Sequence, residues 1–283
     1  MMCVNIIKKL WNNLCENAFI DDMRHSRLII LACILGIIVI SIACVYYLYT
    51  TSNPRNAKTI GELSLPVGYK RVPAEKGSYA AWLRSLPLKK RGTKVYTYKN
   101  RELANFQWLS TGVVDMPLLT NDEQCADVCM RMRAEYLFST GQYSKISFPA
   151  LNGEKLTYTG GNNRNAFEKY LRNVFGRCNT TSLHHSLKTR KLEDMQIGDI
   201  FVYPHRMIAG KNRYGHAVMV ADMAVNKRGK KIFILIEGNT PARDIHVLRN
   251  LKLHHNPWFH LDEDDETLYL NVFRFKDADL KYF

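Results

Sequence analysis

The 21 residues from Leu28 to Leu48, LIILACILGIIVISIACVYYL, contain no charged side chain. At about 1.5 Å of rise per residue, a helix of this length spans roughly 30 Å, the thickness of a bilayer hydrocarbon core. The tyrosines at the end of the segment are typical of a membrane interface. We therefore predict a transmembrane helix over residues 28–48, followed by a polar linker, residues 49–59, and a folded region, residues 60–283.

The charges that flank this segment predict its orientation. Residues 1–27 carry four Lys and Arg side chains, whereas the linker carries only Arg55 and Lys58. Because basic residues favour the cytoplasmic side, residues 1–27 are expected in the cytoplasm and residues 60–283 on the opposite side of the membrane. A cleaved signal peptide is the alternative, but an n-region of roughly 27 residues is long for one.

The chain is basic, with 40 Lys and Arg against 26 Asp and Glu and a formal net charge of +14. A basic surface can bind nucleic acid by releasing counterions from phosphates. The exported region, however, contains only two short basic runs, residues 89–91 and 227–231, and the second is typical of a hairpin turn. The sequence therefore argues against a nucleic-acid partner and favours an anionic envelope polymer or a membrane surface.

Within residues 60–283, helical patterns come first and short apolar strands follow. Thr120-Asn-Asp-Glu123 fits a capping box and marks the start of the longest helix. Asn226-Lys-Arg-Gly229 is expected to join two strands as a hairpin. This order predicts a single α+β domain with an antiparallel sheet. The predicted helices cover residues 79–86, 120–139 and 166–175, and the predicted strands cover residues 94–98, 199–203, 216–221, 231–236 and 268–275.

Three cysteines, Cys125, Cys129 and Cys178, fall on the exported side. An odd number leaves at least one thiol unpaired unless it bridges to another chain. Cys125 and Cys129 are four residues apart on a predicted helix, so they are poorly placed to pair with each other. A free thiol in an exported protein calls for a chemical explanation.

Residues from three segments could form a nucleophilic site. Cys125 lies near the start of the longest predicted helix, where the positive helix end lowers the pKa of a thiol, although a position in the second turn weakens this effect. His216 opens a strand and could accept the thiol proton. Glu237 or Asn239, at the end of the next strand, could hold the imidazole in one tautomer.

Each of these residues also has a purely structural interpretation. Cys125 shares a helical face with Val128 and Met132, so it could belong to the core. A histidine beside a glycine is often structural, and Asn239 lies in Gly-Asn-Thr, which is typical of a turn. No His-Glu-x-x-His motif or comparable spacing is present, so we expect neither a metal nor a cofactor.

The order of the motifs resembles the papain-like amidohydrolases of bacterial cell walls. It comprises the helix-borne cysteine, a Gly-Asp-apolar turn within residues 195–202, a Gly-His-apolar strand and a later strand that ends in Glu-Gly-Asn. The resemblance implies that Cys125 is the nucleophile and His216 the general base. Gln124 would contribute to an oxyanion hole, by its side chain or together with the backbone N–H of Cys125. Cys129 is the alternative nucleophile.

Residues 60–283 more closely resemble a bacterial family, domain of unknown function 4846. That resemblance implies kinship of fold but no established activity, and it leads us to expect Gln-Ser or a similar pair where Glu237-Gly238 stands. The identity of the third catalytic residue is therefore open. The stretches that carry the resemblance are GSYAAWLRSLPLK (77–89), QCADVCMRMRAEYLFS (124–139), IGDIFV (197–202), GHAVMVADMAVNKRGKKIFIL (215–235) and PARDIHVLRN (241–250).

Taken together, these features predict a single-pass protein of the bacterial inner membrane with a cytoplasmic N-terminus and a periplasmic hydrolase domain. The expected reaction is cleavage of an amide or peptide bond, and peptidoglycan stem peptides are the expected substrate from location and resemblance alone. The alternative is a catalytically inactive papain-like domain that binds an envelope glycan or peptide. A third possibility is an assembly protein whose segment 3–22 docks a partner or lies on the membrane surface.

Overall fold

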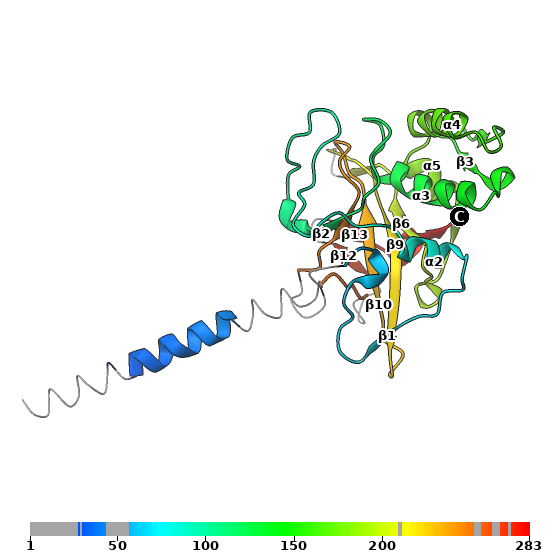
Figure 1. Ribbon diagram of the computed structural model, residues 1–283. Helices are drawn as coiled ribbons and strands as arrows, with labels where there is room; N and C mark the ends of the chain where they lie inside the picture. Colours follow the sequence, from blue (N-terminus) through cyan, green and yellow to red (C-terminus); the bar gives the residue numbers. More distant parts are fainter. Residues whose placement is uncertain are drawn as a thin grey trace, which may run out of the picture. The chain divides into compact units, whose positions relative to one another are not determined.

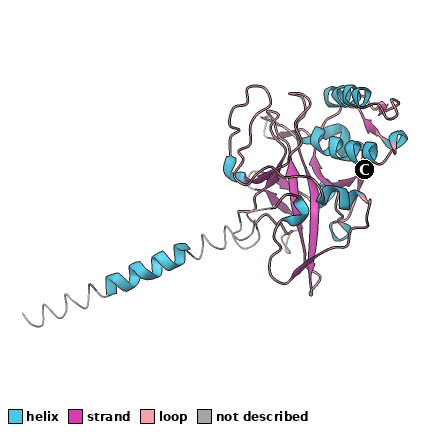
Figure 2. Ribbon diagram, in the orientation of Figure 1, coloured by secondary structure: helices cyan, strands magenta, loops and turns pink. Residues whose placement is uncertain are grey.

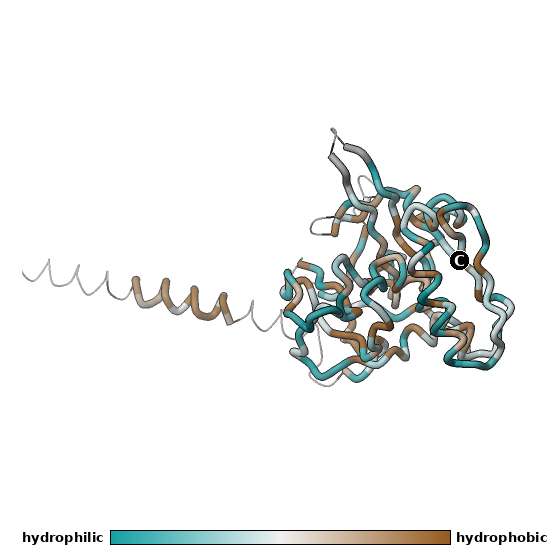
Figure 3. Tube along the Cα trace, turned by 90° about the horizontal axis from the view of Figure 1, so that it is seen from above, coloured by the Kyte–Doolittle hydropathy of each residue, from teal (hydrophilic) through white to brown (hydrophobic). Residues whose placement is uncertain are grey.

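The computed structural model describes residues 28, 30–43, 57–208, 211–251, 256–261, 267–270 and 273–283. The chain divides into two units, residues 1–50 and residues 51–283. In the first unit, residues 28 and 30–43 are helical and mostly hydrophobic (Figure 3). None of the described helices is both long and apolar enough to cross a membrane. The predicted cytoplasmic segment, and parts of the predicted span 28–48 and of the linker, lie outside the described residues.

Within its described residues, the second unit is built on an eight-stranded antiparallel sheet (Figure 1). The strand order is β2-β11-β10-β9-β6-β14-β5, and β1 pairs with the C-terminal end of β9. The strands are β1 (Tyr69–Arg71), β2 (Ser110–Val113), β5 (Lys188–Thr189), β6 (Ile200–Tyr203), β9 (His216–Asn226), β10 (Lys231–Glu237), β11 (His246–Leu248) and β14 (Leu280–Tyr282).

Strand β9 lies at the centre of the sheet and is buried on both faces. Successive side chains of a strand point to opposite faces. Met219 and Ala221 accordingly join the core cluster on one face. Val218 and Val220 join the cluster on the other face, with Phe233. Burial on both faces explains the apolar run of residues 217–221 in this strand.

Helices cover one face of the sheet (Figure 2). Apart from Cys125, the apolar side chains that they bury belong to the same core cluster as Met219 of β9, and none of them belongs to the cluster on the opposite face. Their bounds are α2 (Tyr79–Arg84), α3 (Cys125–Ser139), α4 (Arg164–Arg177) and α5 (Thr180–Ser186). The opposite face is covered in part by a small hairpin of β12 (Leu268–Leu270) and β13 (Phe273–Phe275). Two further hairpins are β3 (Ser147–Pro149) with β4 (Lys155–Thr157), and β7 (Arg206–Ile208) with β8 (Lys211–Arg213).

The α+β class, the antiparallel sheet and the hairpin at Asn226–Gly229 are confirmed. The Asn226 side chain accepts the backbone N–H groups of Arg228 and Lys230, at 2.9 Å and 3.0 Å, which closes the turn between β9 and β10. Gly229 has a φ of 80°, a backbone conformation that favours glycine.

Two strand predictions are wrong in detail. Residues 94–98 form only isolated bridges, because side chains take the backbone donors that a strand ladder would use. The N–H of Val95 donates to Gln107 Oε1 at 2.9 Å, and that of Tyr96 to Asp244 Oδ2 at 3.0 Å. The predicted strand 268–275 is the β12–β13 hairpin instead, in which the chain reverses and Leu268 pairs with Phe275.

The longest helix begins five residues later than predicted. Thr120 does not cap it, since its hydroxyl accepts the N–H of Asp122 at 2.8 Å within the preceding loop. Glu123 turns inward and forms an ion pair with Arg131, 2.7 Å between Oε1 and Nη1. The helix starts at Cys125, after the N–H of Gln124 has donated to the side chain of Asp127 at 2.9 Å.

Candidate active site

Cys125 is the first residue of α3, in the first turn rather than the predicted second turn. First-turn amides have no intrahelical acceptor, so they place positive partial charge beside the thiol. Within the described part of the chain, the N–H of Cys125 donates to no protein acceptor. The residue is 7% exposed. Cys125 is therefore closer to the positive end of the helix than the sequence indicated.

His216 is the first residue of β9 and pairs with Tyr203 of β6. Only glycine fits at position 215, directly before His216. A Cβ on Gly215 would lie 2.1 Å from Thr180 Oγ1 and 2.6 Å from the carbonyl oxygen of Tyr203, closer than any side chain can pack. This close approach of α5 and β6 fixes the point at which the chain enters β9, and with it the position of His216.

Glu237 is the last residue of β10 and contacts the imidazole directly. Its Oε2 lies 2.8 Å from His216 Nε2, and both side chains are buried. Gly238, the next residue, allows the end of β10 to pack closely against α3. A Cβ on Gly238 would lie 2.6 Å from Val128 Cγ2 and 3.1 Å from the carbonyl oxygen of Gln124. Glu237-Gly238 therefore supplies a carboxylate to His216 and a close backbone contact to α3.

The charges of these groups support one another. Burial of the imidazole opposes its protonation, but the Glu237 carboxylate and the Cys125 thiol, through charge and hydrogen bonding, outweigh it and raise the pKa of His216 to about 10. Burial would likewise raise the pKa of Glu237, but His216 and His246 hold it well below its usual range. Since Nε2 of His216 faces the carboxylate, Nδ1 is the ring nitrogen left for the thiol.

Phe273 covers the imidazole. Its ring stacks on that of His216, with 3.8 Å between ring centroids and 16° between planes. It comes from the β12–β13 hairpin on the face of the sheet away from the helices. An apolar ring in this position keeps water from the hydrogen bond between His216 and Glu237, and a drier environment strengthens that bond.

Asn239 does not orient the imidazole directly. In the described structure, its side-chain N–H donates to Glu237 Oε1 at 3.1 Å, and its own oxygen accepts the N–H of Thr240 at 2.7 Å. Of the two residues that the sequence offered for this role, Glu237 is the one in contact with His216 and Asn239 supports Glu237.

Sequence reasoning missed His246. Its Nε2 lies 3.4 Å from Glu237 Oε1, and its Nδ1 donates to the carbonyl oxygen of Asp244 at 3.1 Å. The two residues face each other because β10 and β11 pair with Glu237 opposite His246. This pairing was the available signal, since a tight antiparallel return after Glu-Gly-Asn brings the two residues into register.

Gln124 is held at the edge of the site by Thr240, whose hydroxyl donates to Gln124 Oε1 at 2.7 Å. This bond leaves the two amide N–H groups of Gln124 without a protein acceptor in the described residues. The predicted oxyanion donors, this amide and the Cys125 backbone N–H, are thus both available.

A cleft of about 450 Å³ opens beside Cys125. The start of α3, the loop between α4 and α5, Gly215 and Thr240 line it. Asp127 lies in its wall with Oδ1 buried and unpartnered among the described groups, and burial raises the pKa of this carboxyl well above its usual range. The cleft gives a ligand access to the thiol.

The other thiols are placed differently. Cys129 is fully buried, and burial raises the pKa of its thiol well above the usual range, which removes it as an alternative nucleophile. Cys178 lines the same cleft as Cys125, and burial raises the pKa of its thiol to about 12. All three are free. Among the described residues, no group of three or more His, Cys, Asp or Glu side chains is arranged to hold a metal ion.

Comparison with known proteins gives one match. The family model described as domain of unknown function (4846) matches residues 61–163 and 159–282. No curated protein and no solved structure matches this chain.

Proposed function

Because the chain belongs to the family of domain of unknown function 4846, whose description assigns no activity, we propose a function from the geometry of the site: the protein is a cysteine amidohydrolase with a papain-like arrangement. The observation that carries the proposal is the position of His216 between the Cys125 thiol and the Glu237 carboxylate. A helix-borne cysteine, a strand-borne histidine and a third group that orients the ring form the triad of nucleophilic acyl transfer.

In the proposed reaction, His216 takes the thiol proton and becomes an imidazolium, which a ring pKa of about 10 favours at neutral pH. The sulfur attacks the amide carbonyl and forms a C–S bond. The oxyanion accepts hydrogen bonds from the Cys125 N–H and the Gln124 amide. As the C–N bond breaks, His216 returns the proton to the leaving amine. Water then hydrolyses the thioester, with His216 as the base, and regenerates the thiol.

The proposed substrate class is an amide or peptide of the bacterial envelope, with peptidoglycan stem peptides as the first candidates. Two sequence features support it. The apolar segment 28–48 favours a single-pass anchor in the inner membrane, with the N-terminus in the cytoplasm and the hydrolase domain in the periplasm. The basic excess of residues 59–283 suits an anionic polymer.

The test combines thiol reactivity with product analysis. Full-length protein is treated with iodoacetamide near neutral pH, and labelling at Cys125 and Cys178 is compared by mass spectrometry. The proposal predicts fast alkylation of Cys125 that Cys125→Ser abolishes. The matched control, Cys178→Ser, changes a thiol of the same cleft and should leave hydrolysis of purified muropeptides intact.

An inert Cys125, together with tight binding of muropeptides and no new amine in the products, would support the alternative of a non-catalytic binding domain. Rapid alkylation without muropeptide cleavage would retain the hydrolase and exclude this substrate.

A further inference from the structure

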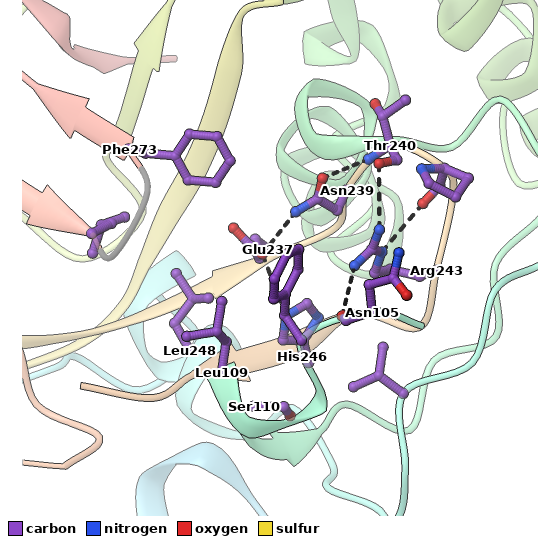
Figure 4. Close-up of a pocket in the computed structure, with 14 residues that line it drawn as sticks. Asn105, Leu109, Ser110, Glu237, Asn239, Thr240, Arg243, His246, Leu248 and Phe273 are labelled. Atoms are coloured by element: carbon purple, nitrogen blue, oxygen red, sulfur yellow. Dashed lines mark hydrogen bonds and ion pairs between the residues drawn. The ribbon is translucent and has the colours of Figure 1, made fainter. Parts of the chain in front are cut away.

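A second cavity, whose lining residues are drawn in Figure 4, shares Thr240 with the cleft beside Cys125. Its volume is about 220 Å³. Thr240 lines both hollows, and Glu237, His246 and Phe273 of the proposed active site form part of the wall. The rest of the wall includes Pro241 and Arg243, from the segment PARDIHVLRN. Arg243 has no part in the proposed reaction.

Arg243 is the cation of this cavity, and it is 8% exposed. Its guanidinium donates to the carbonyl oxygens of Pro241, Asn105 and Thr240, each at 3.3 Å. None of the described carboxylates forms an ion pair with it. A guanidinium has five N–H donors, so donors remain beyond these three long bonds.

Other buried arginines of the domain are compensated differently. Arg131, 3% exposed, is paired with Glu123 at 2.7 Å. The residue next to Arg243, Asp244, is shared by Lys89 and Arg101, at 3.5 Å each. The hydrogen bonds of Arg243 go only to neutral carbonyls, and Glu237 acts on it through charge without forming an ion pair with it. Burying such a cation is costly unless an anion pairs with it. Arg243 is therefore an incomplete ion pair at a cavity wall.

The nearby charges leave the cavity able to accept an anion. Glu237 also lines it, but its carboxylate lies 2.8 Å from His216 Nε2 and 3.4 Å from His246 Nε2. These two contacts compensate its charge. Asn239 also faces the cavity and supplies polar groups that are not charged.

The mouth of the cavity is aromatic. Phe106, 59% exposed, lines it and packs edge-on against Trp108, with 6.2 Å between ring centroids. Phe106 also adopts a φ of 62°, a left-handed backbone conformation that is unusual for a residue other than glycine. The cavity thus combines an apolar rim with a buried cation.

We propose that this cavity binds a carboxylate of the substrate, so that the enzyme prefers peptides with a free carboxyl group close to the bond that Cys125 attacks. The inference rests on the proposed function and names the substrate class of the same site. The peptide would cross Thr240, with its amide in the cleft at Cys125 and its carboxylate on Arg243. Bidentate pairing with a guanidinium is the geometry that carboxylates favour.

Binding is measured without turnover, in the full-length Cys125→Ala protein, by calorimetry with two probes. One is N-acetyl-alanyl-alanine, and the other is the same dipeptide as its C-terminal carboxamide. The acid should bind about tenfold or more tightly, because a charged hydrogen-bonded pair contributes that much. Arg243→Gln should abolish the difference, and the control Arg172→Gln, an exposed arginine of α4, should retain it.

Asn105→Asp provides a second variant that does not disturb a buried residue, since Asn105 is exposed at the cavity. Its added negative charge should weaken binding of the acid probe and leave the affinity of the carboxamide probe unchanged. Equal affinity for both probes, a preference that survives Arg243→Gln, or no binding of either probe in the millimolar range would overturn the proposal. Because Cys125→Ala cannot turn over substrate, these results are independent of whether the protein hydrolyses amides.

Discussion

His216 Nε2 lies 2.8 Å from Glu237 Oε2, and each residue stands at one end of a central strand. Pairing of the two strands fixes the positions of both residues, since β9 and β10 are neighbours in the sheet. The interaction therefore depends on the sheet and not on a mobile loop. The thiol reaches it from α3, an element on the helical face.

Removal of the Glu237 charge should lower the reactivity of Cys125. Glu237→Gln keeps the size and a hydrogen-bonding oxygen but lets the pKa of His216 fall, because the carboxylate is a main cause of its rise to about 10. We expect hydrolysis to drop by about 100-fold, a usual contribution of acid–base catalysis. The pH profile of Cys125 alkylation measures the change. A profile identical to that of the wild type would contradict the assigned role of the carboxylate.

The same pair should make stability depend on pH. The folded-state pKa of His216 is raised from 6.5 to about 10, so its stabilising contribution is complete below 6.5 and is lost as the pH rises toward 10. The pKa of Glu237 is lowered, so its contribution is lost as the pH falls below its ordinary 4.5. Urea unfolding at about pH 6 and about pH 8 should show a decline in the free energy of unfolding. Glu237→Gln should show a smaller decline than the wild type over that interval.

Phe273→Ala should expose the imidazole to water and weaken its bond to Glu237. The ring stacks at 3.8 Å on His216 and is only half-buried, so its loss should affect reactivity more than folding. We expect about tenfold slower hydrolysis with an unchanged circular dichroism spectrum. Phe273→Leu, which restores apolar cover, should recover part of the rate. Full activity of the alanine variant would show that the ring has no part in the site.

His246 is expected to act as a positioning residue through Glu237. His246→Gln keeps a donor for Glu237 Oε1, which the native ring approaches to 3.4 Å, whereas His246→Leu removes it. The leucine variant should lower kcat with little change in KM and shift the pH–rate profile, and the glutamine variant should restore both. If the two variants behave alike, His246 contributes packing alone.

Gly238→Ala should destabilise the domain by about 1–3 kcal/mol, the usual cost of overpacking. Its Cβ would lie 2.6 Å from Val128 Cγ2 and force β10 away from α3. Val128→Ala removes that methyl, so Gly238→Ala should lower the free energy of unfolding less in the Val128→Ala protein than in the wild type. Gly176→Ala is the matched control: it lies in α4 with nothing within 4 Å of the added Cβ, so it should be neutral or slightly stabilising. Urea midpoints compare the four variants with the wild type.

The parts of the fold that the sequence predicted are those that local pattern determines. The apolar runs of β9 and β10 and the turn at Asn226–Gly229 agree with their tertiary environment. The start of α3 does not follow from local pattern, because Glu123 has the spacing of a capping box with Thr120 but is drawn inward by Arg131. A capping motif cannot reveal a buried ion pair eight residues further along the chain.

The candidate site was predictable in its order but not in its contacts. The sequence singled out Cys125, His216 and Glu237 because each stands at the end of an element with a turn signal beside it. The choice of Glu237 over Asn239 needed the geometry, since both follow the same strand. His246 was missed because its role depends on the pairing of β10 with β11, for which the tight return after Glu-Gly-Asn was the available signal. Arg243 was missed because its place at the cavity depends on contacts with residues far away in the sequence, such as Asn105.

Burial of β9 on both faces, with hydrogen-bonded neighbours β6 and β10 on both edges, makes it the strand whose amides water reaches last. In a deuterium-exchange experiment its interior should be protected until the whole domain unfolds. His216 is its first residue, directly after a loop. The proposed base is therefore held by the strand that exchanges last, and its ring should keep its place until the domain unfolds.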